Sequence, residues 1–322
     1  MKARVARISA NGGPEVIEWQ DEELPPPGPG EVRLRSTAVG LNYIDTYHRR
    51  GIYPVELPSG LGIEAAGVVE TVGGDVNGFS PGDRVATFGP LRGAYASARN
   101  IPAESLFRLP DGMPDEIAAA ALLKGCTVEF LVERCARVEA GWPVVVHAAA
   151  GGVGLILVQW LKAVGAEVIG TVSTDAKAQA ARTAGADHVV MSDEDLPARV
   201  RALTGGARVV FDGIGKPTFT ASLDCLVKRG LLVSYGNAGG TVGEVDFGIL
   251  ARKGSLFTTR PTLFDYYSEP AEREAGAGRL FDMLRQGKLK VTIGQRYPLE
   301  QAARAHADLE ARRTTGSTVL LV

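Results

Sequence analysis

Cysteine is scarce in this chain, with three residues among 322, at positions 126, 135 and 225. Three cysteines this far apart cannot form a disulfide scaffold or a paired CxxC zinc site. The formal charge is also nearly balanced, at −2. A nucleic-acid-binding protein usually carries a strongly basic surface, so we do not expect nucleic acid as a partner.

Long apolar segments are equally rare. The most apolar stretch, Val144–Val158, includes His147 and several glycines and is shorter than the roughly 20 residues of a membrane-spanning helix. Met1–Ala10 is basic but has no apolar core, so we expect no secretory signal. These features predict a soluble, cytoplasmic protein that is not bound to a membrane.

Two kinds of pattern divide what remains. Up to Pro110, short runs bounded by glycine and proline predict a β-rich or barrel-like unit, with strands at Glu31–Val39, Ala65–Val72 and Arg84–Phe88. Beyond residue 142, strand and helix patterns alternate, which is typical of βαβ units and a parallel sheet. The strands expected there are Pro143–His147, Val168–Val172, His188–Met191, Val209–Asp212 and Leu231–Tyr235, with a last strand at Ser317–Val322. The expected helices are Glu116–Leu123, Thr127–Arg137, Val153–Val164, Ala176–Ala184, Glu272–Gln286 and Leu299–Arg312.

The most informative motif is Val144–Gly154, VVVHAAAGGVG, in which a strand enters a glycine-rich turn that begins a helix. In the dinucleotide fingerprint, Ala149 takes the first glycine position, Gly151 the second and Gly154 the third. Gly151 lets the backbone approach a pyrophosphate, and the helix N-terminus offers it N–H groups. The alternative is a tight turn in an α/β protein that binds no nucleotide, and the strand–helix–strand context favours the dinucleotide site.

The end of the next strand indicates which dinucleotide is bound. NAD enzymes place an acid at this strand tip to accept hydrogen bonds from the ribose. Here the tip carries the hydroxyls of Thr171, Ser173 and Thr174, followed by Lys177, and these groups suit a 2′-phosphate. Asp175 is close by and argues for NAD. We therefore predict NADPH as the cofactor.

A second motif, Gly78–Gly82 (GFSPG), matches the nucleophile elbow of hydrolases. The residue after the serine must supply an N–H to the oxyanion hole, and Pro81 has none. We predict a turn at this motif. His147, at the end of an apolar strand, is predicted to be a hydrogen-bonded core residue.

Several segments together resemble the medium-chain dehydrogenase/reductase superfamily, and more narrowly its zinc-free quinone oxidoreductases. They are Gly40–Tyr47 (GLNYIDTY), Leu57–Gly67 (LPSGLGIEAAG), Leu123–Val128 (LKGCTV), His147–Gly154, Leu223–Leu232 (LDCLVKRGLL), Val233–Asn237 (VSYGN) and Gly254–Pro261 (GSLFTTRP). The resemblance implies an α/β fold with two domains. Residues 1–122 and 262–322 would form a GroES-like, β-rich catalytic domain, and residues 123–261 a Rossmann domain with a doubly wound parallel sheet. It also implies an active site in the cleft between the domains.

Zinc alcohol dehydrogenases of this superfamily bind their metal through cysteine and histidine. This chain has Asn42, Ile63 and Leu123 at the matching positions. None of the three binds zinc as cysteine or histidine would, so we expect no metal.

The resemblance also implies a set of site residues. The catalytic candidates are Asn42, Tyr47 and Arg260. The cofactor-binding candidates are Asn42, Ile44, Thr46, Lys124, Thr127, Phe130, Gly151, Gly152, Val153, Ser173, Thr174, Lys177, Ser192, Gly213, Tyr235, Gly236, Asn237, Arg260 and Arg312. Two positions depart from the family pattern: Ser192 stands where an aromatic residue is frequent, and Glu129 where tyrosine is common.

The function implied is NADPH-dependent, metal-free reduction of a quinone or a related conjugated enone. Asn42 and Tyr47 would polarise the carbonyl oxygen or relay a proton. Reduction of an enone or an enoyl thioester on the same fold, and non-catalytic NADPH binding, are the alternatives. A homodimer joined through the strand at Ser255–Thr259 is also expected, because an unpaired sheet edge invites pairing.

Overall fold

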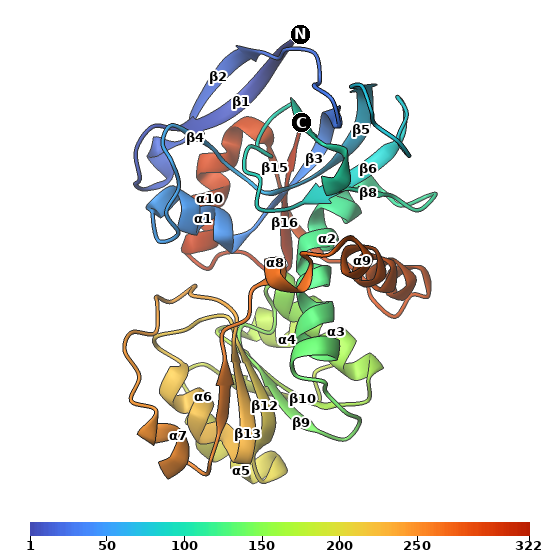
Figure 1. Cartoon of the computed structure of the whole chain (residues 1–322). Coiled ribbons are helices and arrows are strands. Elements are labelled where there is room, and N and C mark those ends of the chain that lie inside the picture. The colour runs from blue at the N-terminus through green and yellow to red at the C-terminus, as the bar shows by residue number, and fades with distance from the viewer. The chain divides into compact units, whose positions relative to one another are not determined.

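A computed structural model describes all of residues 1–322 (Figure 1). The chain divides into two compact units. The first comprises Met1–Leu123 and Ile293–Val322, and the second comprises Lys124–Thr292. We predicted that the chain returns to the first domain at residue 262, whereas the second segment of the first unit begins at Ile293. The predicted domain boundaries stay a prediction.

The first unit is built mainly from antiparallel strands. Its strands are β1 (Lys2–Ile8), β2 (Glu18–Glu23), β3 (Glu31–Leu41), β4 (Ser59–Gly60), β5 (Glu64–Val72), β6 (Arg84–Phe88), β7 (Ala98–Pro102), β8 (Leu106–Arg108), β15 (Ile293–Pro298) and β16 (Ser317–Leu321). The larger sheet has the order β15-β16-β3-β5-β6-β8, with β7 also paired to β3. A smaller sheet has the order β2-β1-β4. Apolar side chains from both sheets, among them Ile8, Leu34 and Val69, form one core with Tyr95.

Helices are few in this unit. They are α1 (Tyr43–Arg50), α10 (Ala302–Glu310) and the single 3-10 turns Pro14–Val16, Ala103–Ser105 and Leu299–Gln301. A longer helix, α2 (Asp115–Glu129), begins in the first unit and is followed in the second by a π-helical turn, Phe130–Cys135. Such turns are rare and occur frequently at functional sites.

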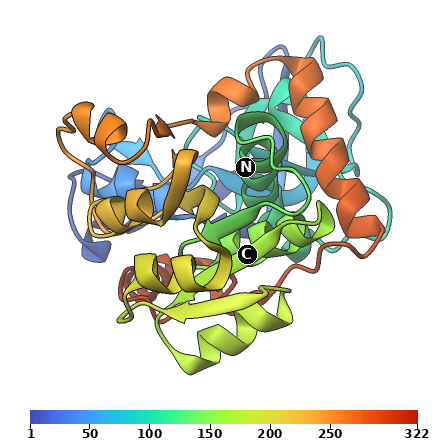
Figure 2. The ribbon, with the colours of Figure 1, turned by 90° about the horizontal axis from the view of Figure 1, so that it is seen from below.

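The second unit contains a six-stranded sheet in which every pairing is parallel. Its strands are β9 (Pro143–Val146), β10 (Glu167–Val172), β11 (His188–Met191), β12 (Ala207–Asp212), β13 (Leu226–Ser234) and β14 (Phe257–Thr259). Its helices are α3 (Gly152–Ala163), α4 (Asp175–Thr183), α5 (Leu196–Thr204), α6 (Phe219–Cys225), α7 (Gly248–Arg252), α8 (Leu263–Tyr266) and α9 (Pro270–Arg285). Helices α3 and α4 lie on one side of the sheet and α5 and α6 on the other (Figures 1 and 2).

The strand order, β11-β10-β9-β12-β13-β14, is that of a doubly wound sheet. The predicted α/β fold with a parallel sheet is confirmed. Strands buried on both faces must be apolar throughout, which explains the continuous run Val144–Val146 in β9.

Most predicted elements are present within a few residues of their expected bounds. The two helices predicted at Glu116–Leu123 and Thr127–Arg137 are wrong in one respect, because α2 continues through Gly125 without a break. Helix α1 was not predicted. The turn predicted at the GFSPG motif is confirmed, since Ser80 N donates to Asp83 Oδ2 (2.8 Å) and Asp83 N donates to Ser80 O (3.1 Å). None of the helices combines the length and the hydropathy needed to cross a membrane.

Candidate functional site

The carboxyl ends of the parallel strands carry most of the predicted cofactor residues. In a doubly wound sheet, dinucleotides bind at this edge, where the order of the strands reverses. The reversal falls between β9 and β12, which are neighbours in the sheet although β10 and β11 come between them in sequence. The predicted residues that follow strand ends are Gly151, Gly152, Val153, Ser173, Thr174, Ser192, Gly213, Tyr235, Gly236, Asn237 and Arg260.

The glycine-rich loop connects β9 to α3. Ala148 has a positive φ of 51°, and Gly151 N donates to the carbonyl oxygen of Ala148 (2.9 Å), so the chain turns sharply before the helix begins at Gly152. Gly154 lies so close to this turn that a Cβ there would be 2.3 Å from Ala148 O. The arrangement presents the N-terminus of α3, with its N–H groups and positive dipole end, beside a backbone stretch with no bulky side chain. These features fit a pyrophosphate.

A buried network lies next to this loop. His147 Nε2 is 2.9 Å from Ser222 Oγ, and its Nδ1 is 3.1 Å from Thr171 Oγ1. Ser222 in turn donates to Asp212 Oδ2 (2.8 Å). Burial lowers the pKa of His147, and the charge of Asp212 opposes this shift. His147 is 2% exposed, so the prediction of a hydrogen-bonded core histidine is confirmed.

The end of β10 carries the residues predicted to meet a 2′-phosphate. Ser173 and Thr174 are exposed, and Lys177 is half-buried in the first turn of α4. Thr174 is the N-cap of α4, and its Oγ1 accepts a hydrogen bond from Lys177 N (3.3 Å). Two hydroxyls and one ammonium group therefore come from a single strand–helix junction. Ser192, after the neighbouring β11, is also exposed.

The loops after β12 and β13 are joined by backbone hydrogen bonds. Tyr235 N donates to Asp212 O (2.8 Å), and Ala238 N donates to Gly213 O (3.1 Å). Arg260, which follows β14, donates to Ser234 O (2.7 Å). With the oxygen of its amide facing Arg260, Asn237 accepts a hydrogen bond from Arg260 Nη2 (3.0 Å). Gly213, Tyr235, Asn237 and Arg260 thus belong to one connected group of strand ends.

Three further candidates lie on α2 and the turn that follows it. Lys124 is 5% exposed, Thr127 is half-buried, and Phe130 is buried with its ring stacked on that of Tyr266 (centroids 4.6 Å apart). Glu129, the departure from the family pattern, is also buried. Its Oε2 accepts hydrogen bonds from Tyr267 (2.6 Å) and Arg134 (2.9 Å).

In the first unit, four candidates lie at the beginning of α1. Asn42 precedes the helix, and Ile44, Thr46 and Tyr47 follow within it. Asn42 is 5% exposed, and its Nδ2 donates to Glu64 Oε2 (2.7 Å) and Gly40 O (3.3 Å). Both hydrogens of this amide therefore have protein acceptors, and its Oδ1 takes part in a capping box with the backbone of Asp45, so that the oxygen can only accept.

The side chains of Tyr47 and Thr46 contact residues within α1 or just after it. Tyr47 packs edge-on against Tyr53 (centroids 5.2 Å apart), and Thr46 Oγ1 donates to Tyr43 O (2.7 Å). Burial and the charge of Glu310 raise the pKa of Tyr43, whereas the charges of Arg312 and Arg50 lower it. Arg312 is exposed. Its charge acts on Tyr43, so it lies near the beginning of α1.

The positions that match the zinc ligands of alcohol dehydrogenases are occupied by structural residues. Ile63 is a core residue, 1% exposed. Leu123 N donates to Glu64 Oε1 (2.6 Å). No three side chains of histidine, cysteine, aspartate or glutamate are grouped so that they could hold a metal ion.

Sequence reasoning missed two buried acids that organise these sites. Glu64 is 0% exposed and holds both Asn42 and the backbone at Leu123. Asp212 is 1% exposed; its Oδ1 accepts hydrogen bonds from the N–H groups of Ile214 and Gly215 (2.8 and 3.0 Å). An acid inside the apolar run GIEAAGVV, and another at the end of VVFD, were the available signals. A buried carboxylate requires partners, so each marks a hydrogen-bonded junction.

Comparison with known proteins places the chain in a family. Residues 28–111 match the alcohol dehydrogenase GroES-like domain, and residues 152–266 match the zinc-binding dehydrogenase family. A quinone oxidoreductase of Pseudomonas aeruginosa is 51% identical over 324 residues, covering 99% of each chain. The chain belongs to the quinone oxidoreductase branch of the medium-chain dehydrogenase/reductase superfamily.

Other members of this superfamily extend the comparison. A 2-haloacrylate reductase from Burkholderia is 44% identical and covers 98% of each chain. The crystal structure of Escherichia coli quinone oxidoreductase in complex with NADPH has a TM-score of 0.97 and 44% identity, and covers 99% of this chain and 100% of that one. The predicted resemblance is confirmed.

Proposed function

We propose that this protein is an NADPH-dependent oxidoreductase that reduces quinones. The observation that carries the proposal is the junction of β9 and α3 at the point where the order of the parallel strands reverses. A glycine-rich loop and a helix N-terminus meet there and fit a pyrophosphate. The quinone oxidoreductase of Pseudomonas aeruginosa and the NADPH complex of the Escherichia coli enzyme support the choice of substrate and cofactor.

In this mechanism the cofactor, when bound, supplies a hydride to an electron-poor carbon or oxygen of the substrate. The chain supplies binding and orientation. Gly151, Gly152 and Val153 hold the pyrophosphate, and Ser173, Thr174 and Lys177 hold the 2′-phosphate. The remaining cofactor contacts come from Ile44, Thr46, Lys124, Thr127, Phe130, Ser192, Gly213, Tyr235, Gly236, Asn237, Arg260 and Arg312.

Asn42 and Tyr47 serve the reacting end of the cofactor. Both Nδ2 hydrogens of Asn42 are used within the protein, so its amide oxygen accepts a hydrogen bond and does not polarise a carbonyl. Polarisation of the substrate carbonyl is therefore assigned to the hydroxyl of Tyr47, and Arg260 is the third catalytic candidate. An extended quinone needs little further assistance, because orientation itself lowers the barrier.

The first experiment follows NADPH and NADH oxidation at 340 nm with a small quinone, in the presence of a metal chelator. We expect turnover with NADPH and a preference for it over NADH. Lys177→Ala should reduce this preference at least about tenfold, because one charge-assisted hydrogen bond is worth about 1.5–3 kcal/mol. Lys288→Ala, at an exposed lysine after α9, is the matched control. An unchanged preference in Lys177→Ala would remove Lys177 from the 2′-phosphate site.

A second candidate function is reduction of an activated C=C bond. The 44% identical 2-haloacrylate reductase favours it, since hydride addition to such a bond uses the same cofactor and the same orientation. The same assay with 2-chloroacrylate in place of the quinone separates the two. A higher kcat/KM for 2-chloroacrylate than for every quinone tested would replace quinone reduction as the main activity.

We also propose a cytoplasmic homodimer. All three cysteines are free thiols, as expected in a reducing compartment. Strand β14 is an edge strand of the parallel sheet, and Phe257 on it is 60% exposed. A second copy can extend the sheet at this edge. Phe257→Arg should convert the dimer to a monomer by light scattering, and a monomeric mass for the unmodified protein would exclude the dimer.

A further inference from the structure

A chain of buried polar side chains crosses the first unit and has no role in the function proposed above. Tyr95 Oη donates to Asp45 Oδ2 (3.0 Å) and is 2.9 Å from His306 Nε2. His306 Nδ1 is 2.9 Å from Arg49 Nη1, and Arg49 Nη2 contacts both oxygens of Glu310 (2.9 and 2.8 Å). Apart from Glu310, these side chains are at most 1% exposed.

The direction of each hydrogen bond in this chain follows from chemistry. A guanidinium group only donates, so His306 Nδ1 must accept from Arg49. The proton of the neutral ring is then on Nε2, which donates to the oxygen of Tyr95, and the Tyr95 hydroxyl donates to Asp45. Burial and the adjacent charge of Arg49 lower the pKa of His306 to about 3, which keeps the ring neutral at ordinary pH. Each hydrogen bond between these side chains therefore has only one possible direction.

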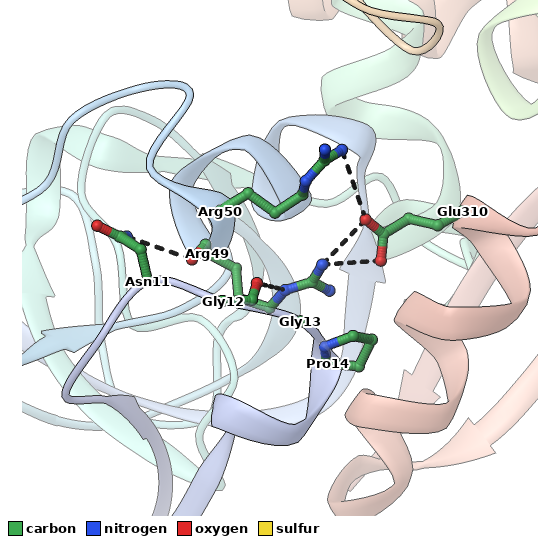
Figure 3. A pocket seen from close by; sticks show the side chains of 7 residues that line it. All are labelled: Asn11, Gly12, Gly13, Pro14, Arg49, Arg50 and Glu310. Carbon is green, nitrogen blue, oxygen red and sulfur yellow. Dashed lines mark hydrogen bonds and ion pairs between the residues drawn. The ribbon is translucent and has the colours of Figure 1, made fainter.

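Both ends of this row of hydrogen-bonded side chains act on α1. At one end, Asp45 Oδ2 also accepts the hydrogen bond from Asn42 N (2.9 Å), which fixes the first turn of the helix. At the other end, Arg49 belongs to the last turn of α1. Figure 3 shows Arg49 reaching the carboxylate of Glu310 and the carbonyl oxygen of Gly12. The helix that carries Ile44, Thr46 and Tyr47 is thus fastened at its beginning and at its end.

We propose that Tyr95 and His306 are positioning residues, which hold Asn42 and Tyr47 in place through Asp45 and Arg49. The inference rests on the proposed function, in which Asn42 and Tyr47 face the reacting end of the cofactor and the quinone. Loss of the Tyr95 hydroxyl leaves His306 Nε2 without its acceptor and Asp45 without one of its donors. The first turn of α1 then loses the support that fixes the direction of the Asn42 and Tyr47 side chains.

The test uses Tyr95→Phe and a matched control, Tyr297→Phe. Tyr297 also donates to a carboxylate of the first unit, Asp308 (2.9 Å), but belongs to β15. Both variants lose one tyrosine–aspartate hydrogen bond. We expect Tyr95→Phe to lower kcat/KM for the quinone about tenfold and Tyr297→Phe to change it less than twofold. The Kd for NADPH, measured by its fluorescence, should change less than threefold in both, because the glycine loop and Lys177 lie in the second unit.

Substitution of His306 provides a rescue experiment. The glutamine amide can accept from Arg49 through its oxygen and donate to Tyr95 through its nitrogen, whereas leucine can do neither. His306→Leu should therefore match the loss of Tyr95→Phe, and His306→Gln should recover to within about threefold of the unmodified enzyme. Thermal unfolding checks that each variant is folded. If Tyr95→Phe does not fold, the comparison of the two His306 variants decides the question.

A spectroscopic readout separates this inference from the proposed function. The side-chain amide signal of Asn42, identified by its loss in Asn42→Ser, should shift in Tyr95→Phe and stay in place in Tyr297→Phe. If the unmodified protein reduces no quinone, the proposed function fails. The Asn42 signal still shows whether the hydrogen bonds of Tyr95 and His306 hold Asn42 in place. Unchanged quinone kinetics or an unmoved Asn42 signal in folded Tyr95→Phe would overturn the positioning role.

Discussion

Acid should destabilise this protein through two buried histidines of the first unit. His306 is 0% exposed, and burial and the charge of Arg49 lower its pKa to about 3. His48 is 9% exposed, and burial and the charge of Arg92 lower its pKa to about 4. In the unfolded chain a histidine titrates near 6.5. As the pH falls below that value, the unfolded state takes up protons that the folded state does not.

The magnitude follows from proton linkage. The stability that each histidine contributes is fully present above pH 6.5 and is lost as the pH falls towards its folded-state pKa. Between pH 8 and pH 5, each of the two should cost about 2 kcal/mol of unfolding free energy. Their sum of about 4 kcal/mol is a large fraction of the roughly 5–15 kcal/mol that stabilises a typical protein.

The assay is denaturant unfolding of the unmodified protein and His306→Gln at pH 8, 7, 6 and 5. At pH 8 the imidazole is neutral in both folded and unfolded states, so the difference there measures only the lost contacts. Between pH 6 and pH 5, the slope of the unfolding free energy against pH should be smaller in His306→Gln by about 1.2 kcal/mol per pH unit. Equal slopes would show that His306 binds its proton equally well in the folded and unfolded states, and would refute the reasoning.

Three other substitutions test the second unit and its edge. Gly154→Val should raise the Kd for NADPH more than tenfold in calorimetry, because the Cβ of the valine would lie 2.3 Å from Ala148 O. The control is Gly278→Ala, at a position where a Cβ has open space. Ser222→Ala should lower the unfolding free energy by about 1–3 kcal/mol, since it leaves His147 and Asp212 without a shared buried partner. Thr220→Ala, at an exposed position of the same helix, should lower the unfolding free energy far less. Equal effects of the two substitutions would contradict a stabilising role for the buried hydrogen bonds of Ser222. Phe257→Arg should abolish the dimer in light scattering while quinone turnover continues, and loss of turnover together with the dimer would mean that the edge supports the site itself.

Local patterns were sufficient where one segment determines its own structure. The run from Pro143 to Ala163 combines continuous apolar residues, a glycine-rich turn and an amphipathic helix, so β9, the loop and α3 were predicted within a residue or two. The prediction of two helices around Gly125 failed for a tertiary reason. A Cβ at Gly125 would lie 2.4 Å from a methyl group of Leu280 in α9, so this glycine allows a close approach and does not end the helix. Helix α1 was missed because it has only eight residues; the signals available were the capping box of Asn42 and Asp45 and the glycine that ends the helix, Gly51.

By itself, the sequence determined the class of fold, the glycine loop, the hydroxyl and lysine groups after β10, and the family resemblance that named the site residues. The tertiary structure decided which of these residues meet, because parallel pairing aligns strand ends that lie far apart in the chain. It also decided that both hydrogens of the Asn42 amide face Glu64 and Gly40. The contact of Tyr95 with His306, separated by 211 residues, has no local signal in either segment. Hydrogen bonds between such distant side chains exist only once the core has brought them together and excluded water.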